Sequence, residues 1–197
     1  PDAWTSFRRR FGRELPPDVV ALGDRMQGDR SVLERLSSRP WTLVHGDLRI
    51  NNVMFAAGAS AEVRAVIDWQ TAVRGRGPMD VATLFATSLA AEHRAAAERE
   101  LLPAYHAALV RGGVSGYSFQ ACWRDYRLAL LNQFSQIVFL AAMIDVPSEV
   151  SDDVGAVTGA RLLTALMDVE LDDVAPARRR RRWLPVLRGR TRAAAGL

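Results

Sequence analysis

The sequence predicts an α+β protein that is mostly helical, on three observations. The chain has 197 residues, which is enough to bury a sizeable core. Apolar residues recur at helical spacing over most of its length, whereas short β-prone runs occur only between residues 41 and 67. Hydrophobic residues make up 49% and charged residues 24%, which excludes disorder or a coiled coil as an account of the whole chain.

Helical patterns come first along the chain. In residues 2–13 three aromatic residues recur at spacings of three and four among arginines, a pattern typical of an amphipathic helix that ends before Pro16. In residues 18–36 the apolar positions predict helical segments that break near Gly28 and stop before Pro40.

The middle of the chain changes to strand patterns. Residues 41–44, 53–55 and 63–67 are short β-prone apolar runs. The last two are separated by the small and polar residues 56–62, which predict the loop of a hairpin.

Helical patterns return after Pro78 and continue to about residue 175. We expect helices over roughly 79–91, 92–111, 119–144 and 148–173. The stretch 128–144 is apolar, but it is short for a membrane span and polar residues interrupt it, so we interpret it as a buried core helix.

The charged residues and the cysteine narrow the function. All 26 basic residues are arginine, and the absence of lysine excludes a P-loop lysine and a Schiff-base lysine within the chain. Eight of these arginines lie in residues 178–197, which contain no acidic residue. We expect this tail to be disordered, with contact to nucleic acid or a membrane as the less favoured alternative. Cys122 is the only cysteine, which fits a cytoplasmic protein.

Three polar residues around the expected hairpin form the candidate site. If 53–55 and 63–68 pair, Asn52 and Asp68 become neighbours, and Asp47 lies on the loop that precedes them. Two carboxylates and an amide oxygen suit Mg²⁺, and the set meets the needs of phosphoryl transfer. The alternative is an ordinary polar loop whose side chains bond to backbone groups in turns.

The segment Val44-His45-Gly46-Asp47-Leu48-Arg49-Ile50-Asn51-Asn52-Val53-Met54-Phe55, with Val66-Ile67-Asp68-Trp69-Gln70 after it, resembles a known pattern. It is similar to the catalytic loop and metal-binding motif of the aminoglycoside phosphotransferase and choline kinase superfamily, particularly its ecdysteroid-kinase-like branch and bacterial relatives. The resemblance implies the C-terminal lobe of a protein-kinase-like fold over residues 1–177, with a small hairpin that carries the motifs and a helical bundle after it.

The resemblance also implies roles. Asp47 would be the catalytic base toward the hydroxyl group of a small molecule, and Asn52 and Asp68 would hold Mg²⁺ with ATP as phosphoryl donor. His45 would be architectural, and Asp80 would brace the catalytic loop or act as an ordinary acid in the first turn of a helix. Arg49 would face the transferred phosphate or be a solvated loop residue.

The sequence departs from that family in one respect. A complete kinase of this type has an N-terminal lobe with a phosphate-covering loop and a lysine, and neither is present in these residues. We therefore expect an ATP- and Mg²⁺-dependent small-molecule kinase that transfers phosphate poorly without its N-terminal lobe. The alternatives are a non-catalytic, pseudokinase-like binding module and an interaction protein that binds through its basic tail.

Overall fold

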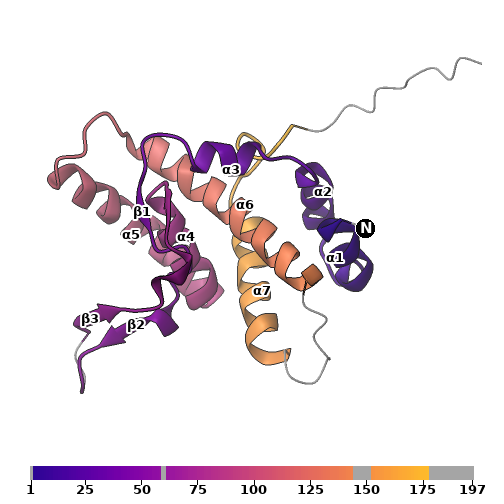
Figure 1. Cartoon of the computed structure of the whole chain (residues 1–197), viewed down its shortest axis with the longest axis horizontal. Helices are drawn as coiled ribbons and strands as arrows, with labels where there is room; N and C mark the ends of the chain where they lie inside the picture. The colour runs from indigo at the N-terminus through magenta and orange to yellow at the C-terminus, as the bar shows by residue number, and fades with distance from the viewer. Residues whose placement is uncertain (1, 59–60, 144–151, 178–197) are drawn as a thin grey trace, which may run out of the picture.

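The computed structural model describes residues 2–58, 61–143 and 152–177, with side chains from residue 157 onward in the last range. These residues are mostly helical and contain two small antiparallel sheets, which confirms the predicted α+β class (Figure 1). The helices are α1 (Ala3–Phe11), α2 (Pro17–Met26), α3 (Ser31–Leu36), α4 (Pro78–Ser88), α5 (Ala91–Arg111), α6 (Phe119–Met143) and α7 (Asp152–Asp168). The strands are β1 (Thr42–Val44), β2 (Val53–Phe55), β3 (Val63–Val66) and β4 (Val73–Gly75). Two single turns of 3-10 helix are η1 (Ile50–Asn52) and η2 (Trp69–Thr71).

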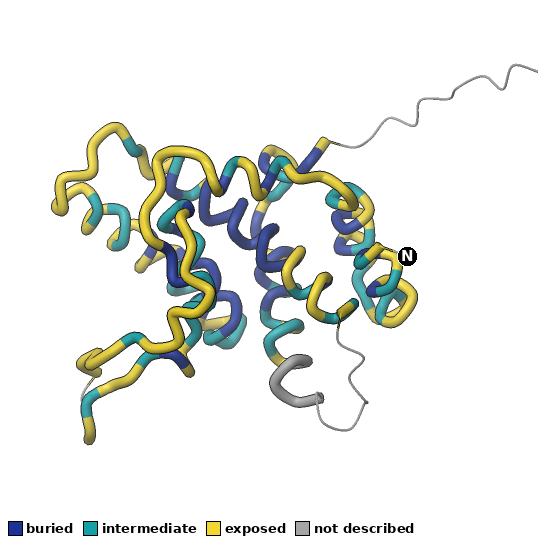
Figure 2. Tube along the Cα trace, viewed as in Figure 1, coloured by how far each residue is buried: buried dark blue, intermediate teal, exposed yellow. Residues whose placement is uncertain are grey.

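Helix α6 is the centre of the core. It packs against α1, α3, α4, α5 and α7 (Figure 1), and its middle, residues 125–134, is buried (Figure 2). The buried apolar side chains on and around it include Leu128, Leu130, Leu131, Phe134, Phe85 and Leu162. Burying one such side chain contributes roughly 1.5–3 kcal/mol, so this layer of helices supports the rest of the fold.

The apolar stretch that the sequence assigns to a buried core helix lies in α6 up to residue 143. Burial of residues 128–134 confirms that interpretation for its first half, whereas Phe139, Leu140 and Met143 are more than half exposed. Among the described helices, none combines the length and the apolarity that a bilayer crossing requires.

Local signals explain where the helices begin. The carboxylate of Asp2 accepts a hydrogen bond from the backbone of Thr5 at 2.9 Å and so caps α1. Helices α2 and α4 each start with a proline. Proline suits this position because the first N–H groups of a helix have no partner within it, and proline has no N–H. Pro17 is followed by Asp18 and Pro78 by Asp80, and an acid in the first turn is favoured by the helix dipole.

The strands form two separate pairs. Strand β2 pairs with β3 as the sequence predicts, with Val53 opposite Val66. Strand β1 pairs with β4, with Val44 opposite Val73, and this second pair was not predicted. The β2–β3 hairpin projects from the helical body and is exposed on most of its surface (Figures 1 and 2).

Some expectations differ from the structure at their edges. The first helix is shorter than 2–13, and the last ends at Asp168 rather than at residue 173, while residues 148–151 of its expected start lie outside the described residues. The arginine-rich tail, residues 178–197, lies outside the described residues.

Candidate functional site

The buried side chain of His45 connects three segments of the candidate site. Its Nε2 lies 2.8 Å from the carbonyl oxygen of Ile67, and its Nδ1 lies 3.3 Å from the backbone nitrogen of Asp47. A neutral ring with the proton on Nε2 satisfies both contacts, because Nε2 then donates and Nδ1 accepts. The carbonyl of His45 also accepts a hydrogen bond from the hydroxyl of Thr71 at 3.0 Å. His45 is 1% exposed, so its place is architectural.

The turn at Gly46 needs a glycine. Its φ of +85° lies in the left-handed region, and a Cβ there would lie 2.5 Å from the carbonyl oxygen of Thr71. The glycine therefore lets the chain pass close to η2 while it redirects the next residue, Asp47, away from the strand.

The carboxylate of Asp80 binds the backbone of this turn. One carboxylate oxygen accepts the N–H of His45 at 2.8 Å and the other accepts the N–H of Gly46 at 3.0 Å. Because Asp80 stands in the first turn of α4, the turn at His45 and Gly46 is fixed to a helix that packs on the core.

The carboxylate of Asp47 is paired rather than free. Its Oδ2 accepts a hydrogen bond from Arg49 at 2.9 Å, and the two side chains are 32% and 41% exposed, respectively. Arg49 thus lies beside the residue expected to be the base. The guanidinium therefore occupies one of the acceptor positions of this carboxylate.

Asn52 follows one turn later at the end of η1. Its Nδ2 donates to the carbonyl of Asp47 at 2.9 Å, which leaves the amide oxygen as the remaining acceptor group of this buried side chain. The carbonyl of Asn52 accepts the N–H of Ile67 at 3.0 Å, so the chain just before Asp68 lies against Asn52.

Asp68 occupies an unusual backbone conformation. Its φ is +66° and its ψ is +54°, and among the described residues other than glycine it alone has a positive φ. Aspartate tolerates this left-handed conformation better than most residues. The next residue, Trp69, fixes the turn, since its indole donates to the carbonyl of Val66 at 2.8 Å and its ring lies 4.7 Å from that of His45. Asp68 is exposed at the tip of this turn.

The hydrogen bonds of His45 and Asn52 therefore bring together the backbone segments that carry Asp47, Asn52 and Asp68. Two carboxylates and one amide oxygen are hard donors that fit a divalent cation only when water or ligand oxygens complete its shell. In the described part of the chain no group of three or more His, Cys, Asp or Glu side chains is arranged to hold a metal ion. A cation here would be shared with a bound ligand.

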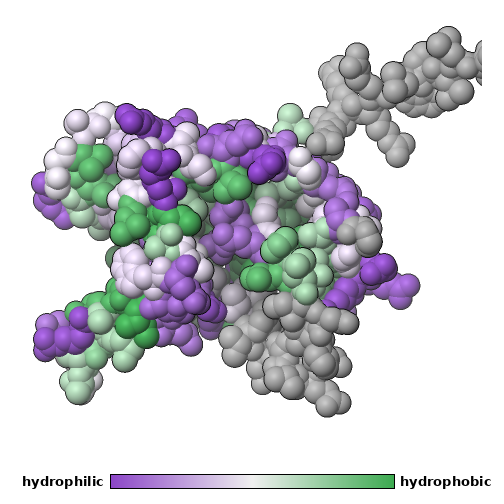
Figure 3. Space-filling view, in the orientation of Figure 1, coloured by the Kyte–Doolittle hydropathy of each residue, from purple (hydrophilic) through white to green (hydrophobic). Residues whose placement is uncertain are grey.

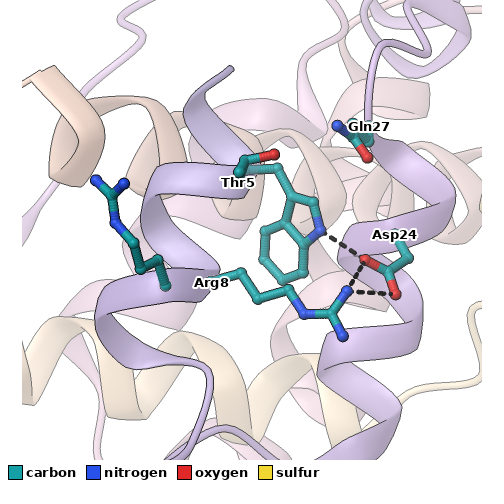
Figure 4. Close-up of a pocket in the computed structure, with 6 residues that line it drawn as sticks. Thr5, Arg8, Asp24 and Gln27 are labelled. Atoms are coloured by element: carbon teal, nitrogen blue, oxygen red, sulfur yellow. Dashed lines mark hydrogen bonds and ion pairs between the residues drawn. The ribbon is translucent and has the colours of Figure 1, made fainter. Parts of the chain in front are cut away.

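A pocket of about 390 Å³ lies elsewhere, between α1 and α2 (Figure 4). The indole of Trp4 donates to Asp24 at 2.8 Å, and the guanidinium of Arg8 contacts both oxygens of the same carboxylate. The polar groups that line the pocket therefore bond to one another across the two helices. None of the expected site residues lines it.

The comparisons with known proteins identify a family. A family model described as "Uncharacterized oxidoreductase dhs-27" matches residues 33–175, well over half of the chain. The chain belongs to this family. No curated protein and no solved structure matches the sequence. The match begins at α3 and ends beyond α7, so it includes the whole candidate site.

Membership of the oxidoreductase-named family corrects the functional expectation. The expected phosphotransferase is wrong, because the matching family is described as an oxidoreductase and not as a kinase. The assignments of kinase, ATP binding and magnesium as properties of the protein lose their support with it. The physical reason is that Asp47, Asn52 and Asp68 define a set of donors, and the same donors can serve many reactions.

Three contributors to the site were not predicted. Thr71, Trp69 and Ser88 act through one hydroxyl, one indole and another hydroxyl, and each bonds to a residue distant in sequence or to a turn. Trp69 stands in the motif that carries the resemblance but was given no role, and nothing in the local sequence marks Thr71 or Ser88. The Pro78-to-Asp80 helix start was the one signal that pointed to a contact with the loop.

Proposed function

We propose that the region around Asp47, Asn52 and Asp68 is the ligand site of an enzyme that acts on the hydroxyl group of a small molecule. Asp47 would take or return the hydroxyl proton, and Asn52 and Asp68 would hold a divalent cation shared with the ligand. The observation that carries the proposal is the bonding of His45. One buried ring connects the loop of Asp47 to the turn of Asp68, although the two lie 21 positions apart.

The geometry supports a preorganised site. The backbone on both sides of Asp47 is bonded, on one side to Asp80 and on the other through the carbonyl that Asn52 contacts. Residues that carry chemistry work best when their surroundings fix them in advance, since little reorganisation is then needed as charge develops.

Arg49 gives the site a resting partner for its carboxylate. The Arg49–Asp47 pair is partly exposed, so it contributes about 0–1 kcal/mol. We infer that the positive charge of Arg49, which lies beside Asp47, opposes the binding of a cation to Asn52 and Asp68. Removing the arginine should then tighten cation binding by up to about fivefold, which corresponds to 1 kcal/mol.

The test is a titration of the chain with Mn²⁺ and Mg²⁺ that measures their binding affinity. Calorimetry monitors both ions, and the spin-resonance signal of free Mn²⁺ monitors Mn²⁺ independently. Asp68→Asn should weaken binding by tenfold or more, whereas Arg49→Gln should strengthen it. Asp18→Asn is the matched control, because Asp18 is an exposed acid in the first turn of α2, outside the site. Equal affinity in the parent chain, Asp68→Asn and Asp18→Asn would refute the cation site.

The family description favours a second candidate, oxidation of the same hydroxyl group. Asp47 would take the hydroxyl proton while hydride leaves the adjacent carbon for a nicotinamide or flavin, and a carbonyl group would form. Strand β4 leads into α4 through Gly75-Arg76-Gly77, but this turn lacks the third glycine of the dinucleotide-binding pattern, so the acceptor would bind to another part of the protein. Incubation of the complete gene product with alcohols and NAD, NADP or a flavin tests this by cofactor reduction.

We also propose, from the resemblance of the Asp47 loop to the kinase-like superfamily, that a further domain covers the strands. Exposed apolar side chains support this, and they gather over the β2–β3 hairpin (Figure 3). Met54, Phe55 and Val63 are each between 45% and 52% exposed. Patches of this kind on a soluble domain mark interaction surfaces. Binding of a hydrophobic dye by this chain, reduced in the complete gene product, is the expected result, and equal dye binding would contradict the proposal.

A further inference from the structure

Helix α4 contacts the Asp47 loop at a second point. Besides Asp80 at its start, Ser88 at its end accepts the N–H of Ile50 on its Oγ at 2.9 Å. Eight residues separate Asp80 from Ser88, or about 12 Å along the helix axis. The residues between the two anchored points of the loop are those that carry the Asp47 and Arg49 side chains. The loop is therefore bonded to α4 on both sides of its polar groups.

The bond to Ser88 completes a turn that cannot complete itself. Ile50 is the first residue of η1, and the first N–H groups of a helical turn have no acceptor within it. The Ser88 hydroxyl supplies that acceptor from another helix. Asn52 stands two residues further along the same turn, so the orientation of η1 sets the orientation of the Asn52 amide.

The hydroxyl of Ser88 is itself oriented by its neighbours on α4. Its Oγ lies 3.4 Å from the Oγ1 of Thr87, and Thr87 donates its own proton to the carbonyl of Thr83 at 2.6 Å. Ser88 is then the donor toward Thr87, which leaves its lone pairs to the Ile50 N–H. Such chains of hydroxyls align the dipoles of successive bonds. The carbonyl of Thr87 also accepts from Arg161 of α7 at 3.1 Å, which ties this end of α4 to the helical body.

We propose that Ser88 is a positioning residue of the candidate site, which orders residues 47–52 by holding η1. The effect on overall stability should be small, because Ile50 is 46% exposed and water can solvate its N–H when the serine is lost. The effect on the loop should be larger, since the Asp80 contacts then hold one side only. The part of this inference that concerns cation binding rests on the proposed function.

The experiment compares Ser88→Ala with Ser88→Thr, which keeps the hydroxyl oxygen. Ser135→Ala is the control, because Ser135 lies on the exposed face of α6 and bonds only to the carbonyl of Leu131 in its own helix. Amide hydrogen exchange is measured residue by residue, and Mn²⁺ affinity is measured on the same samples. We expect Ser88→Ala to speed exchange at residues 47–52 by about two- to tenfold and to weaken Mn²⁺ binding by a similar factor, as the loss of one hydrogen bond implies. Ser88→Thr and Ser135→Ala should match the parent.

The outcomes separate this inference from the proposed function. If exchange in Ser88→Ala is unchanged, or rises at Ile50 alone, the positioning role is refuted whether or not Mn²⁺ binds. If the parent chain binds Mn²⁺ and Ser88→Ala binds it equally, the role is also refuted. If the parent chain does not bind Mn²⁺, the proposed cation site fails, while faster exchange throughout 47–52, restored by Ser88→Thr, still supports the ordering of the loop by Ser88.

Discussion

Asp80→Asn tests the bracing of the loop most directly. The carboxylate of Asp80 accepts two backbone hydrogen bonds, at 2.8 and 3.0 Å, from His45 and Gly46. Hydrogen bonds to a charged group are worth about 1.5–3 kcal/mol each. Asparagine keeps one oxygen as an acceptor but turns an NH₂ group toward the second N–H. We therefore expect Asp80→Asn to lower the free energy of unfolding by about 2–3 kcal/mol.

Part of any such loss comes from the helix dipole, and Asp18→Asn measures that part. Asp18 occupies the first turn of α2 after Pro17, as Asp80 does in α4 after Pro78. An acid at this position contributes about 0.3–1 kcal/mol through the dipole alone. The difference between the two variants isolates the bonds to the loop.

The assay is urea unfolding followed by circular dichroism. With a slope of about 2–3 kcal/mol per molar urea, the midpoint of Asp80→Asn should fall by roughly 1 M and that of Asp18→Asn by a few tenths at most. Equal midpoints in the two variants would refute the bracing argument, because Asp80 would then act only as a helix-start acid.

Three further predictions follow from single contacts. Gly46→Ala should cost about 2 kcal/mol or more in urea unfolding, because φ is +85° and the new Cβ would lie 2.5 Å from the Thr71 carbonyl; a loss equal to that of Gly58→Ala, which has open space around the Cβ position, would contradict the steric part. Burial raises the pKa of the Cys122 thiol from 9 to about 11, so the stability that the neutral thiol contributes is fully present below pH 9 and is lost as the pH rises through 11. Cys122→Ala should therefore flatten the decline of the unfolding free energy at alkaline pH, and an unchanged slope would count against this reasoning. Arg94→Met should lower the free energy of unfolding by about 3–5 kcal/mol, because Arg94 is fully buried against Glu98 and Asp168 and its loss leaves Glu98 with the Tyr126 hydroxyl as its remaining partner among the described contacts. Adding Glu98→Gln should recover part of that loss, and strictly additive losses in thermal unfolding would rule out the coupling.

Much of the candidate site was predictable because its residues are close in sequence. The hairpin of β2 and β3 follows from two β-prone runs around a loop of small residues, and its register brings Asn52 next to the residue before Asp68. Asp80 was expected at the start of a helix, where Pro78 and an acid are favoured. The interpretation failed at the reaction. A spacing of donors constrains which atoms meet, but it does not specify the bond that is broken, and the family match corrected the expected phosphotransferase.

The sequence by itself determined the mostly helical class, the helix α6 and the β2–β3 hairpin, because periodicity and turn-forming composition are local properties of a chain. The tertiary structure alone decided that β1 pairs with β4, that Arg49 occupies the Asp47 carboxylate, and that Ser88 holds Ile50. The β1–β4 and Ser88–Ile50 contacts join residues about 30 or more positions apart, so no local pattern in the chain predicts them. Arg49 and Asp47 are only two positions apart. Whether their side chains meet still depends on the shape of the loop, which is bonded to α4 at Asp80 and at Ser88.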